Sequence, residues 1–272
     1  MWGIKMTWLL LLLIPLLYVF LIAPRLPRRP IGRLAGWDYA HRGLWNDELP
    51  ENSLPAFQNA IDHGFGMEMD VHLTADDKLV IFHDDTLQRM CGDPRRITDC
   101  TLAELQALRL KGKEQIPTFD AFLQLVNGQV PLIIEIKTCK RIDRLCDLVA
   151  SRLDDYTGDY CIESFDPRAV RWFRQHRPQV IRGQLAFGLV KPSKNPKTPI
   201  NRFVASLAQN VLGRPDFIAF EAATDHSLPM RLARLFRPWL VAWTVRDAAT
   251  MDRLRGRYDL QIFEGFVPEK HP

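Results

Sequence analysis

Short apolar runs alternate with amphipathic stretches along the chain from about residue 37 onward. The apolar runs have the length of strands, whereas the stretches between them repeat apolar side chains every three or four residues, as amphipathic helices do. The predicted strands are Asp38–His41, Gly66–Val71, Leu79–His83, Leu132–Lys137, Tyr160–Ser164, Arg182–Leu185, Phe217–Glu221, Leu240–Thr244 and Gln261–Glu264. The predicted helices are Ser53–His63, Leu102–Leu110, Phe119–Val126, Ile142–Leu153, Pro167–Gln175, Arg202–Val211, Leu228–Phe236 and Ala248–Arg255.

The regular alternation of strands and helices predicts an α/β fold. About eight strand–helix units lie within residues 37–272, which is the number of units and close to the length of a (β/α)8 TIM barrel. A doubly wound open sheet is the alternative. That fold is favoured by a glycine-rich phosphate-binding loop after the first strand, but here the first strand is followed by Arg42 and Gly43. We therefore expect a TIM barrel.

The N-terminal segment has the pattern of a membrane anchor. Residues 6–24 carry no charge, and residues 8–22 are almost wholly apolar; at about 1.5 Å per residue their helix approaches the thickness of the hydrocarbon core. A cleaved signal peptide is the alternative, but no small-residue cleavage site follows and the positive charge lies mainly after the apolar run. The sequence thus predicts one transmembrane helix within an anchor of residues 1–24, a linker at 25–36 rich in Pro and Arg, and a catalytic barrel at 37–272.

Charge and cysteine content exclude several classes of protein. The formal charge of the 272 residues is +4, but residues 1–33 hold five basic side chains and no acidic one, so the remainder has 31 basic against 32 acidic side chains. A barrel without basic excess has no electrostatic basis for binding nucleic acid. The arginines after the apolar run predict a catalytic domain in the cytoplasm, on the membrane's positive side. Five cysteines without a CxxC pair predict neither a disulfide framework nor a zinc site.

Acidic side chains stand at the ends of two predicted strands. Glu68 and Asp70 are two residues apart, so they lie on one face of a strand, and Glu135 ends the strand after the hairpin-like return. In a barrel these ends meet where active sites are built. Converging carboxylates repel each other unless a cation compensates, and oxygen ligands favour Mg²⁺ or Ca²⁺. The alternatives are that Glu68 and Asp70 form a pair at the rim that is salt-bridged to basic side chains, and that Glu135 simply pairs with Lys137.

Basic side chains and histidines occur at the same strand ends. His41 and Arg42 end the first strand, His83 follows the return strand, and Lys137 lies two residues after Glu135. Two histidines can exchange protons near neutral pH, and cations stabilise the charge that develops on phosphate oxygens. Together with a divalent cation, this set predicts phosphoryl-transfer or phosphodiester chemistry.

These residues belong to short motifs that follow each other in a fixed order. The motifs are Ala40-His41-Arg42-Gly43, Pro50-Glu51-Asn52-Ser53, Glu68-Met69-Asp70-Val71, His83-Asp84, Ile116-Pro117-Thr118, Glu135-Ile136-Lys137, Ser164-Phe165 and Trp243-Thr244-Val245. The ordered set resembles the glycerophosphodiester phosphodiesterase family, whose fold is a (β/α)8 barrel. Two positions depart from the family pattern: Arg246 stands where Asn is usual, and Glu264 stands where the last strand usually ends in Thr-Asp.

The resemblance implies a role for each matched residue. It implies one divalent cation, Mg²⁺ or Ca²⁺, held by Glu68, Asp70 and Glu135, with Glu51 as a candidate fourth ligand. It implies that His41 and His83 form the acid–base pair, without saying which is the acid. Arg42 and Lys137 resemble the phosphate-binding cations, and Phe165 and Trp243 resemble apolar walls beside the glycerol moiety.

The function that follows from the resemblance is metal-dependent hydrolysis of glycerophosphodiesters to glycerol phosphate and an alcohol. One enzymatic alternative is lysophospholipase D or sphingomyelinase-D-like cleavage of membrane lysolipids. For that alternative, Lys191, Lys194 and Lys197 in the loop after Arg182–Leu185 would touch anionic headgroups, although an ordinary solvated loop has the same composition. A membrane-tethered scaffold without activity is a third possibility, against which the complete set of carboxylates, histidines and lysine argues.

Overall fold

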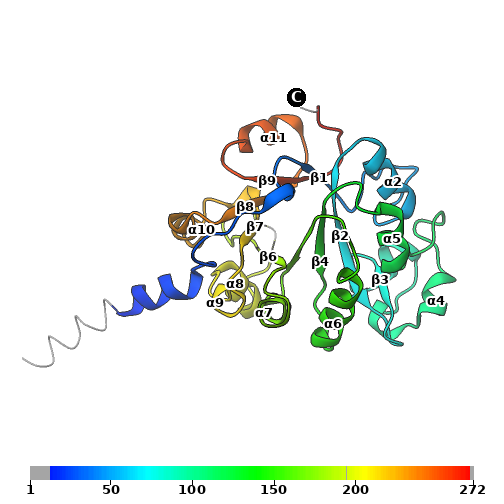
Figure 1. The fold of residues 1–272 in the computed structure, drawn as a ribbon, viewed down its shortest axis with the longest axis horizontal. Coiled ribbons are helices and arrows are strands. Elements are labelled where there is room, and N and C mark those ends of the chain that lie inside the picture. The colour runs from blue at the N-terminus through cyan, green and yellow to red at the C-terminus, as the bar shows by residue number, and fades with distance from the viewer. Residues whose placement is uncertain (1–12, 194, 270–272) are drawn as a thin grey trace, which may run out of the picture.

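Eight parallel strands close into a barrel in the computed structural model, which describes residues 13–193 and 195–269 (Figure 1). The strands of the barrel are β1 (Asp38–His41), β2 (Gly66–Leu73), β4 (Leu132–Ile136), β5 (Tyr160–Ser164), β6 (Ile181–Ala186), β7 (Phe217–Glu221), β8 (Trp239–Val245) and β9 (Leu260–Phe263). Their order around the sheet is β1-β9-β8-β7-β6-β5-β4-β2, and parallel pairing of β1 with β2 closes the ring. The predicted TIM barrel is confirmed, and the open doubly wound sheet is excluded.

One further strand lies outside the ring. β3 (Leu79–Ile81) pairs antiparallel with the end of β2. After β3, the amide of Phe82 donates to the carbonyl of Asp70 at 3.1 Å. This return therefore brings His83 back to the carboxyl end of β2.

The helices cover the outside of the barrel. The α-helices are α2 (Leu54–Asp62), α3 (Gln88–Cys91), α4 (Leu102–Gln106), α5 (Phe119–Val126), α6 (Ile142–Leu153), α7 (Pro167–His176), α8 (Pro199–Ala205), α9 (Asn210–Gly213), α10 (Leu228–Ala233) and α11 (Ala248–Leu254). The short 3-10 helices are η1 (Gly32–Leu34), η2 (Ile97–Asp99), η3 (Ala222–Thr224) and η4 (Arg234–Phe236). Six of the predicted helices correspond to one of these α-helices each, and the predicted Leu228–Phe236 comprises α10 and η4.

The single helix predicted over Arg202–Val211 is wrong, because the chain forms α8 and α9 with a turn between them. Leu207 in this turn has a φ of 58°, a left-handed conformation that cannot continue a right-handed helix. The Leu207 side chain is fully buried, so its burial in the core accompanies the break.

An apolar cluster fills one part of the barrel interior, and buried acidic side chains of β2 lie in another. Tyr39, Ile133 and Val241 belong to a buried cluster that also contains Ile31 and Leu34 from the segment before β1. Along β2, Met67 and Met69 pack in the larger cluster while Glu68 and Asp70 are buried polar residues, as the period of two requires. The polar groups therefore gather at the carboxyl ends of the strands.

The first half of the predicted anchor, residues 1–12, lies outside the described residues. Residues 13–22 form a helix that projects from the barrel beside α8 and α9 (Figure 1). Within the described residues, no helix combines the length and the apolar character that crossing a membrane would require. The predicted linker lies against the barrel: the Arg25 amide donates to the Pro215 carbonyl at 2.9 Å, and the Trp239 indole donates to the Arg29 carbonyl at 2.8 Å.

Candidate active site

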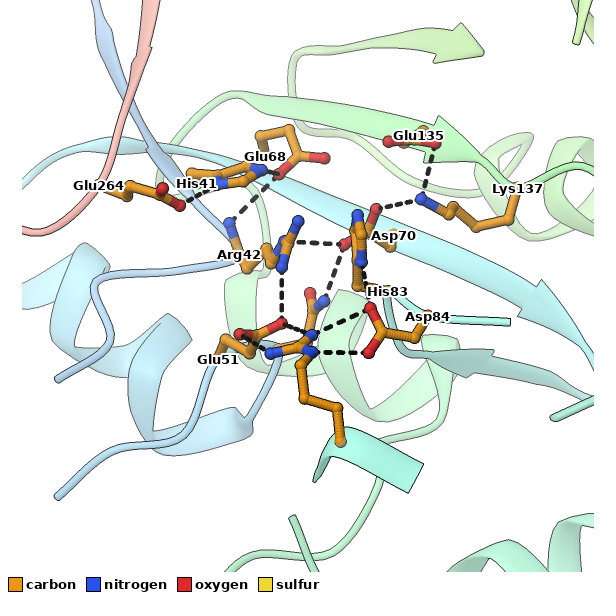
Figure 2. Close-up of polar contacts among 12 residues, drawn as sticks. His41, Arg42, Glu51, Glu68, Asp70, His83, Asp84, Glu135, Lys137 and Glu264 are labelled. Carbon is orange, nitrogen blue, oxygen red and sulfur yellow. Dashed lines mark hydrogen bonds and ion pairs between the residues drawn. The ribbon is translucent and has the colours of Figure 1, made fainter. Parts of the chain in front are cut away.

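Three carboxylates converge at the carboxyl ends of neighbouring strands (Figure 2). Glu68 and Asp70 come from β2, and Glu135 comes from β4, where it is the register partner of Asp70. One oxygen from each of the three lies within 4.8 Å of the other two. All three residues are buried, so the strands themselves hold the carboxylates in place.

Burial and the neighbouring charges shift the pKa values of these carboxylates. Burial and the negative charges of Asp70 and Glu135 raise the pKa of Glu68 well above its usual value. Burial also acts to raise the pKa of Asp70, but Lys137 and nearby cations hold it well below its usual value. A divalent cation would relieve the repulsion among the three. Their oxygen donors are those that Mg²⁺ and Ca²⁺ prefer, so the residues present fit such an ion.

Two cations flank the carboxylates (Figure 2). The Lys137 ammonium lies 2.9 Å from Glu135 Oε1 and 3.1 Å from Asp70 Oδ1. On the other side, Nε of Arg42 lies 3.6 Å from Asp70 Oδ2. The same Oδ2 accepts a hydrogen bond of 2.8 Å from the Asn52 amide. Asp70 is thus the carboxylate that both cations share.

Glu51 does not join the three-carboxylate cluster. Its Oε1 accepts from Nη1 of Arg42 at 2.7 Å, and its two oxygens accept from Arg89 at 2.7 and 2.8 Å. Burial acts to raise the pKa of Glu51, but the two guanidinium groups lower it overall. Both oxygens of Glu51 therefore accept hydrogen bonds from arginines.

His41 makes a carboxylate pair at the end of β1. Its Nδ1 donates to Oε2 of Glu264, which follows β9, at 2.5 Å, and its Nε2 lies 3.8 Å from Glu68 Oε2. The other oxygen of Glu264 lies 2.7 Å from Nη2 of Arg246. Burial lowers the pKa of His41 and outweighs the opposing effect of Glu264. Because Nδ1 carries the proton, Nε2 keeps a lone pair, and it lies on the side of Glu68.

His83 makes a second carboxylate pair on the loop after β3. Its Nδ1 lies 2.6 Å from Oδ1 of Asp84, whose other oxygen accepts from Nε of Arg89 at 2.6 Å. Burial acts to raise the pKa of Asp84, but His83 and Arg89 lower it overall. Since Arg89 also binds Glu51, this second pair is tied to the arginine network around Arg42.

A cavity of about 240 Å³ connects the two histidines with the carboxylates. The rings of Phe165 and Trp243 line it and meet edge to face, with centroids 5.6 Å apart. Glu163 from β5 also lines the cavity, and its Oε2 has no hydrogen-bond partner among the described residues. Burial and the negative charge of Glu135 raise the pKa of Glu163 well above its usual value, so this environment favours the protonated carboxyl.

The structure brings nearly all the predicted site residues together. The predicted residues that line the cavity are His41, Arg42, Glu68, His83, Glu135, Phe165 and Trp243. Asp70 and Lys137 lie beside them through the contacts given above, whereas Glu51 binds arginines outside the carboxylate cluster.

Sequence reasoning missed several residues of this network. Glu163 could have been predicted, because a charged residue stands there in a predicted buried strand. Asn52 and Asp84 stood inside the quoted motifs without an assigned role. Arg89 stands in none of the motifs, and one of its partners, Glu51, lies 38 residues away in the sequence, so the sequence alone did not indicate it. Glu264 and Arg246 were noted only as departures from a pattern.

Comparisons with known proteins agree with this geometry. A model of the glycerophosphoryl diester phosphodiesterase family matches residues 41–258. A glycerophosphodiester phosphodiesterase of Caldanaerobacter subterraneus subsp. tengcongensis is 37% identical over 166 residues, which are 56% of this chain and 68% of that protein. The YhdW protein of Bacillus subtilis is 32% identical over 152 residues, which are 52% of this chain and 62% of that protein. The match thus spans about two thirds of the length of these two relatives.

A solved structure shows the same fold. The phosphodiesterase of Oleispira antarctica, in complex with the product sn-glycerol-3-phosphate, superposes with a TM-score of 0.71 at 20% identity, over 86% of this chain and 95% of that chain. The family model covers β2 and all strands from β4 to β8, ends just before β9, and includes every one of the ten predicted site residues. The chain therefore belongs to the glycerophosphoryl diester phosphodiesterase family.

Proposed function

We propose that this protein hydrolyses glycerophosphodiesters to glycerol phosphate and an alcohol, using one Mg²⁺ or Ca²⁺ ion. The observation that carries the proposal is the cluster of three buried carboxylates beside two carboxylate-paired histidines, with both histidines, Glu68 and Glu135 lining one cavity. The family supports the reaction class, and the relative from Oleispira antarctica binds sn-glycerol-3-phosphate as its product.

The three carboxylates Glu68, Asp70 and Glu135 would hold the cation. When bound, such an ion polarises a phosphoryl oxygen and neutralises part of the developing negative charge. The Lys137 ammonium and the Arg42 guanidinium add positive charge beside the same carboxylates, where they stabilise an anionic phosphate.

One histidine acts as the base of the reaction and the other acts as the acid. Nδ1 of His41 is fixed on Glu264, so the lone pair of Nε2 accepts the proton of the attacking hydroxyl. Burial disfavours the charged form of His41, which suits a base. The attacking hydroxyl belongs to the glycerol moiety of the substrate, and its oxygen attacks phosphorus while His83, whose Nδ1 lies 2.6 Å from Asp84 Oδ1, protonates the leaving alcohol as its bond to phosphorus breaks. Water then opens the resulting cyclic phosphate to glycerol phosphate. Phe165 and Trp243 provide the apolar wall against which the glycerol carbons pack.

The test is release of choline from glycerophosphocholine by the purified full chain. Activity is expected with Mg²⁺ or Ca²⁺, none is expected in EDTA, and readdition of the ion restores it. Turnover of lysophosphatidylcholine with no turnover of glycerophosphocholine would instead support the lysophospholipase D alternative. Absence of turnover of either substrate with both ions would support the scaffold.

We also propose that residues 1–24 anchor the enzyme in a membrane, with residues 25–36 as a linker and the barrel of residues 37–272 in the cytoplasm. The uncharged residues 6–24 and the arginines after them support this arrangement. Protease treatment of sealed membrane vesicles of either orientation tests it. The barrel is expected to be digested only where the cytoplasmic face is exposed.

A further inference from the structure

Several arginines surround one aspartate at the end of the barrel opposite the active site. Asp216 directly precedes β7, and Arg182 is the second residue of β6, so both lie at the amino ends of the strands. Nη2 of Arg29 lies 2.9 Å from the Asp216 carboxylate, Nη1 of Arg182 lies 3.6 Å from it, and Nε of Arg25 lies 3.8 Å from it. One carboxylate thus faces three guanidinium groups.

A cavity of about 520 Å³ opens beside this cluster. It is lined by four arginines, Arg25, Arg174, Arg182 and Arg214. Arg182 is only 2% exposed, and its Nη1 has no hydrogen-bond partner within the part of the chain that the structure describes. Burial and the positive charges of the neighbouring arginines lower the pKa of Arg182 to about 10. The cavity therefore has an excess of positive charge and an unused donor.

An apolar helix adjoins the cavity. The helix of residues 13–22 exposes Leu13, Ile14, Leu16, Leu17 and Phe20. Its C-terminal end is fixed to the barrel: Nη1 of Arg214 donates to the carbonyls of Phe20 and Ala23 at 2.8 and 2.7 Å, and the Arg214 guanidinium lies 4.5 Å from the centre of the Phe20 ring. Exposed apolar side chains next to a basic site are the pattern of a surface that contacts anionic lipid.

We propose that the cavity lined by Arg25, Arg174, Arg182 and Arg214 binds the phosphate of an anionic phospholipid headgroup while the helix of residues 13–22 inserts into the same bilayer. Guanidinium groups bind phosphate through paired hydrogen bonds, and Nη1 of Arg182, which lies 3.6 Å from Asp216, has no hydrogen-bond partner among the described residues. Phe20 lines the cavity as well as the helix surface, so the headgroup and the apolar side chains meet at one place.

This arrangement gives the barrel an orientation. The headgroup site lies at the amino ends of the strands, whereas Glu68, Asp70 and Glu135 lie toward the carboxyl ends. The mouth of the active site then faces away from the bilayer. A membrane-held enzyme in this orientation takes its diester from the aqueous phase.

The test is a titration of the full chain in neutral detergent micelles with EDTA present. The probes are dihexanoyl phosphatidylglycerol, dihexanoyl phosphatidylcholine and inorganic phosphate. We expect phosphatidylglycerol to bind most tightly. The double variant Arg25→Gln/Arg174→Gln is expected to weaken that binding about tenfold or more, since it removes two of the four arginines that line the cavity. Arg253→Gln, which removes an exposed arginine from α11, is the matched control and is expected to leave binding unchanged.

Three results would overturn the proposal. Equal binding of phosphatidylglycerol by the wild type and the double variant would show that the cavity does not bind this lipid. Equal binding of the two lipids would remove the selection for an anionic headgroup, and equally tight binding of inorganic phosphate would make this a site for free phosphate. Hydrolysis of glycerophosphocholine with its metal ion is expected to be unchanged in the double variant, which shows that it folds; if it is not, the single Arg174→Gln variant decides. Binding in EDTA does not depend on turnover, so this proposal and the proposed function fail separately.

Discussion

Nδ1 of His41 lies 2.5 Å from one oxygen of Glu264 (Figure 2), and Nη2 of Arg246 lies 2.7 Å from the other. Glu264 and Arg246 are the two positions at which the sequence departs from the family motifs. The structure shows that the two departures contact each other. Glutamate is one methylene longer than aspartate, and Arg246 occupies the oxygen that His41 does not use. The pair therefore acts as one unit that orients His41.

Replacing Glu264 by Gln should impair the proton transfer that we assign to His41. The variant loses the negative charge that fixes the Nδ1 proton, so the rate with glycerophosphocholine should fall by up to about 10²–10⁴-fold, the usual contribution of an acid–base step. Glu264 also raises the pKa of His41, so its loss should move the acidic limb of the kcat/KM profile to lower pH. The exposed Glu269→Gln is the control, and an unchanged profile in Glu264→Gln would contradict the role.

Replacing Arg246 by Asn should have a smaller effect that depends on Glu264. The Arg246 side chain is 67% exposed, and an exposed ion pair contributes about 0.2–1 kcal/mol. We expect kcat to fall by less than about tenfold, and we expect no further loss when Arg246→Asn is added to Glu264→Gln. A double-mutant cycle measures this coupling. Additive effects would mean that Arg246 acts on the substrate independently of Glu264.

The carboxylate contacts separate metal ligands from residues that position arginines. Glu68→Gln, Asp70→Asn and Glu135→Gln should each abolish the binding of Mg²⁺ or Ca²⁺ in calorimetry, because each removes one of three converging carboxylates. Glu51→Gln should still bind the ion and should weaken its affinity by no more than about 10–100-fold, as expected for a residue outside the ligand set. Loss of binding in Glu51→Gln equal to that in Glu68→Gln would restore it as the fourth ligand.

The buried Glu163 should make stability depend on pH. Its pKa is raised in the folded state, so the folded protein binds this proton more tightly than the unfolded chain does. Stability is therefore lost as pH rises above the unfolded value of about 4.3. In EDTA, Glu163→Gln should raise Tm more at pH 8 than at pH 5. The same difference in Tm at both pH values would contradict a raised pKa of Glu163 in the folded protein.

The sequence by itself determined the barrel and most of the site. Strand bounds such as Tyr160–Ser164 were confirmed, because apolar runs of strand length separated by amphipathic stretches have few other solutions. Glu68 and Asp70 were placed on one face because side chains alternate along a strand, and Glu135 joined them because parallel strands of a barrel end at the same edge.

Tertiary structure alone decided which distant side chains meet. His41 contacts Glu264 only because β1 pairs with β9 and closes the barrel, and Glu51 contacts Arg89 only because the loop before α2 lies beside α3. Local pattern also failed at Leu207, where a left-handed residue breaks an apparently continuous helix. The basic cavity combines residues from the N-terminal segment, α7, β6 and the end of α9. Periodicity and motif order are local properties, whereas these contacts depend on how the whole ring closes and on how far each side chain reaches across it.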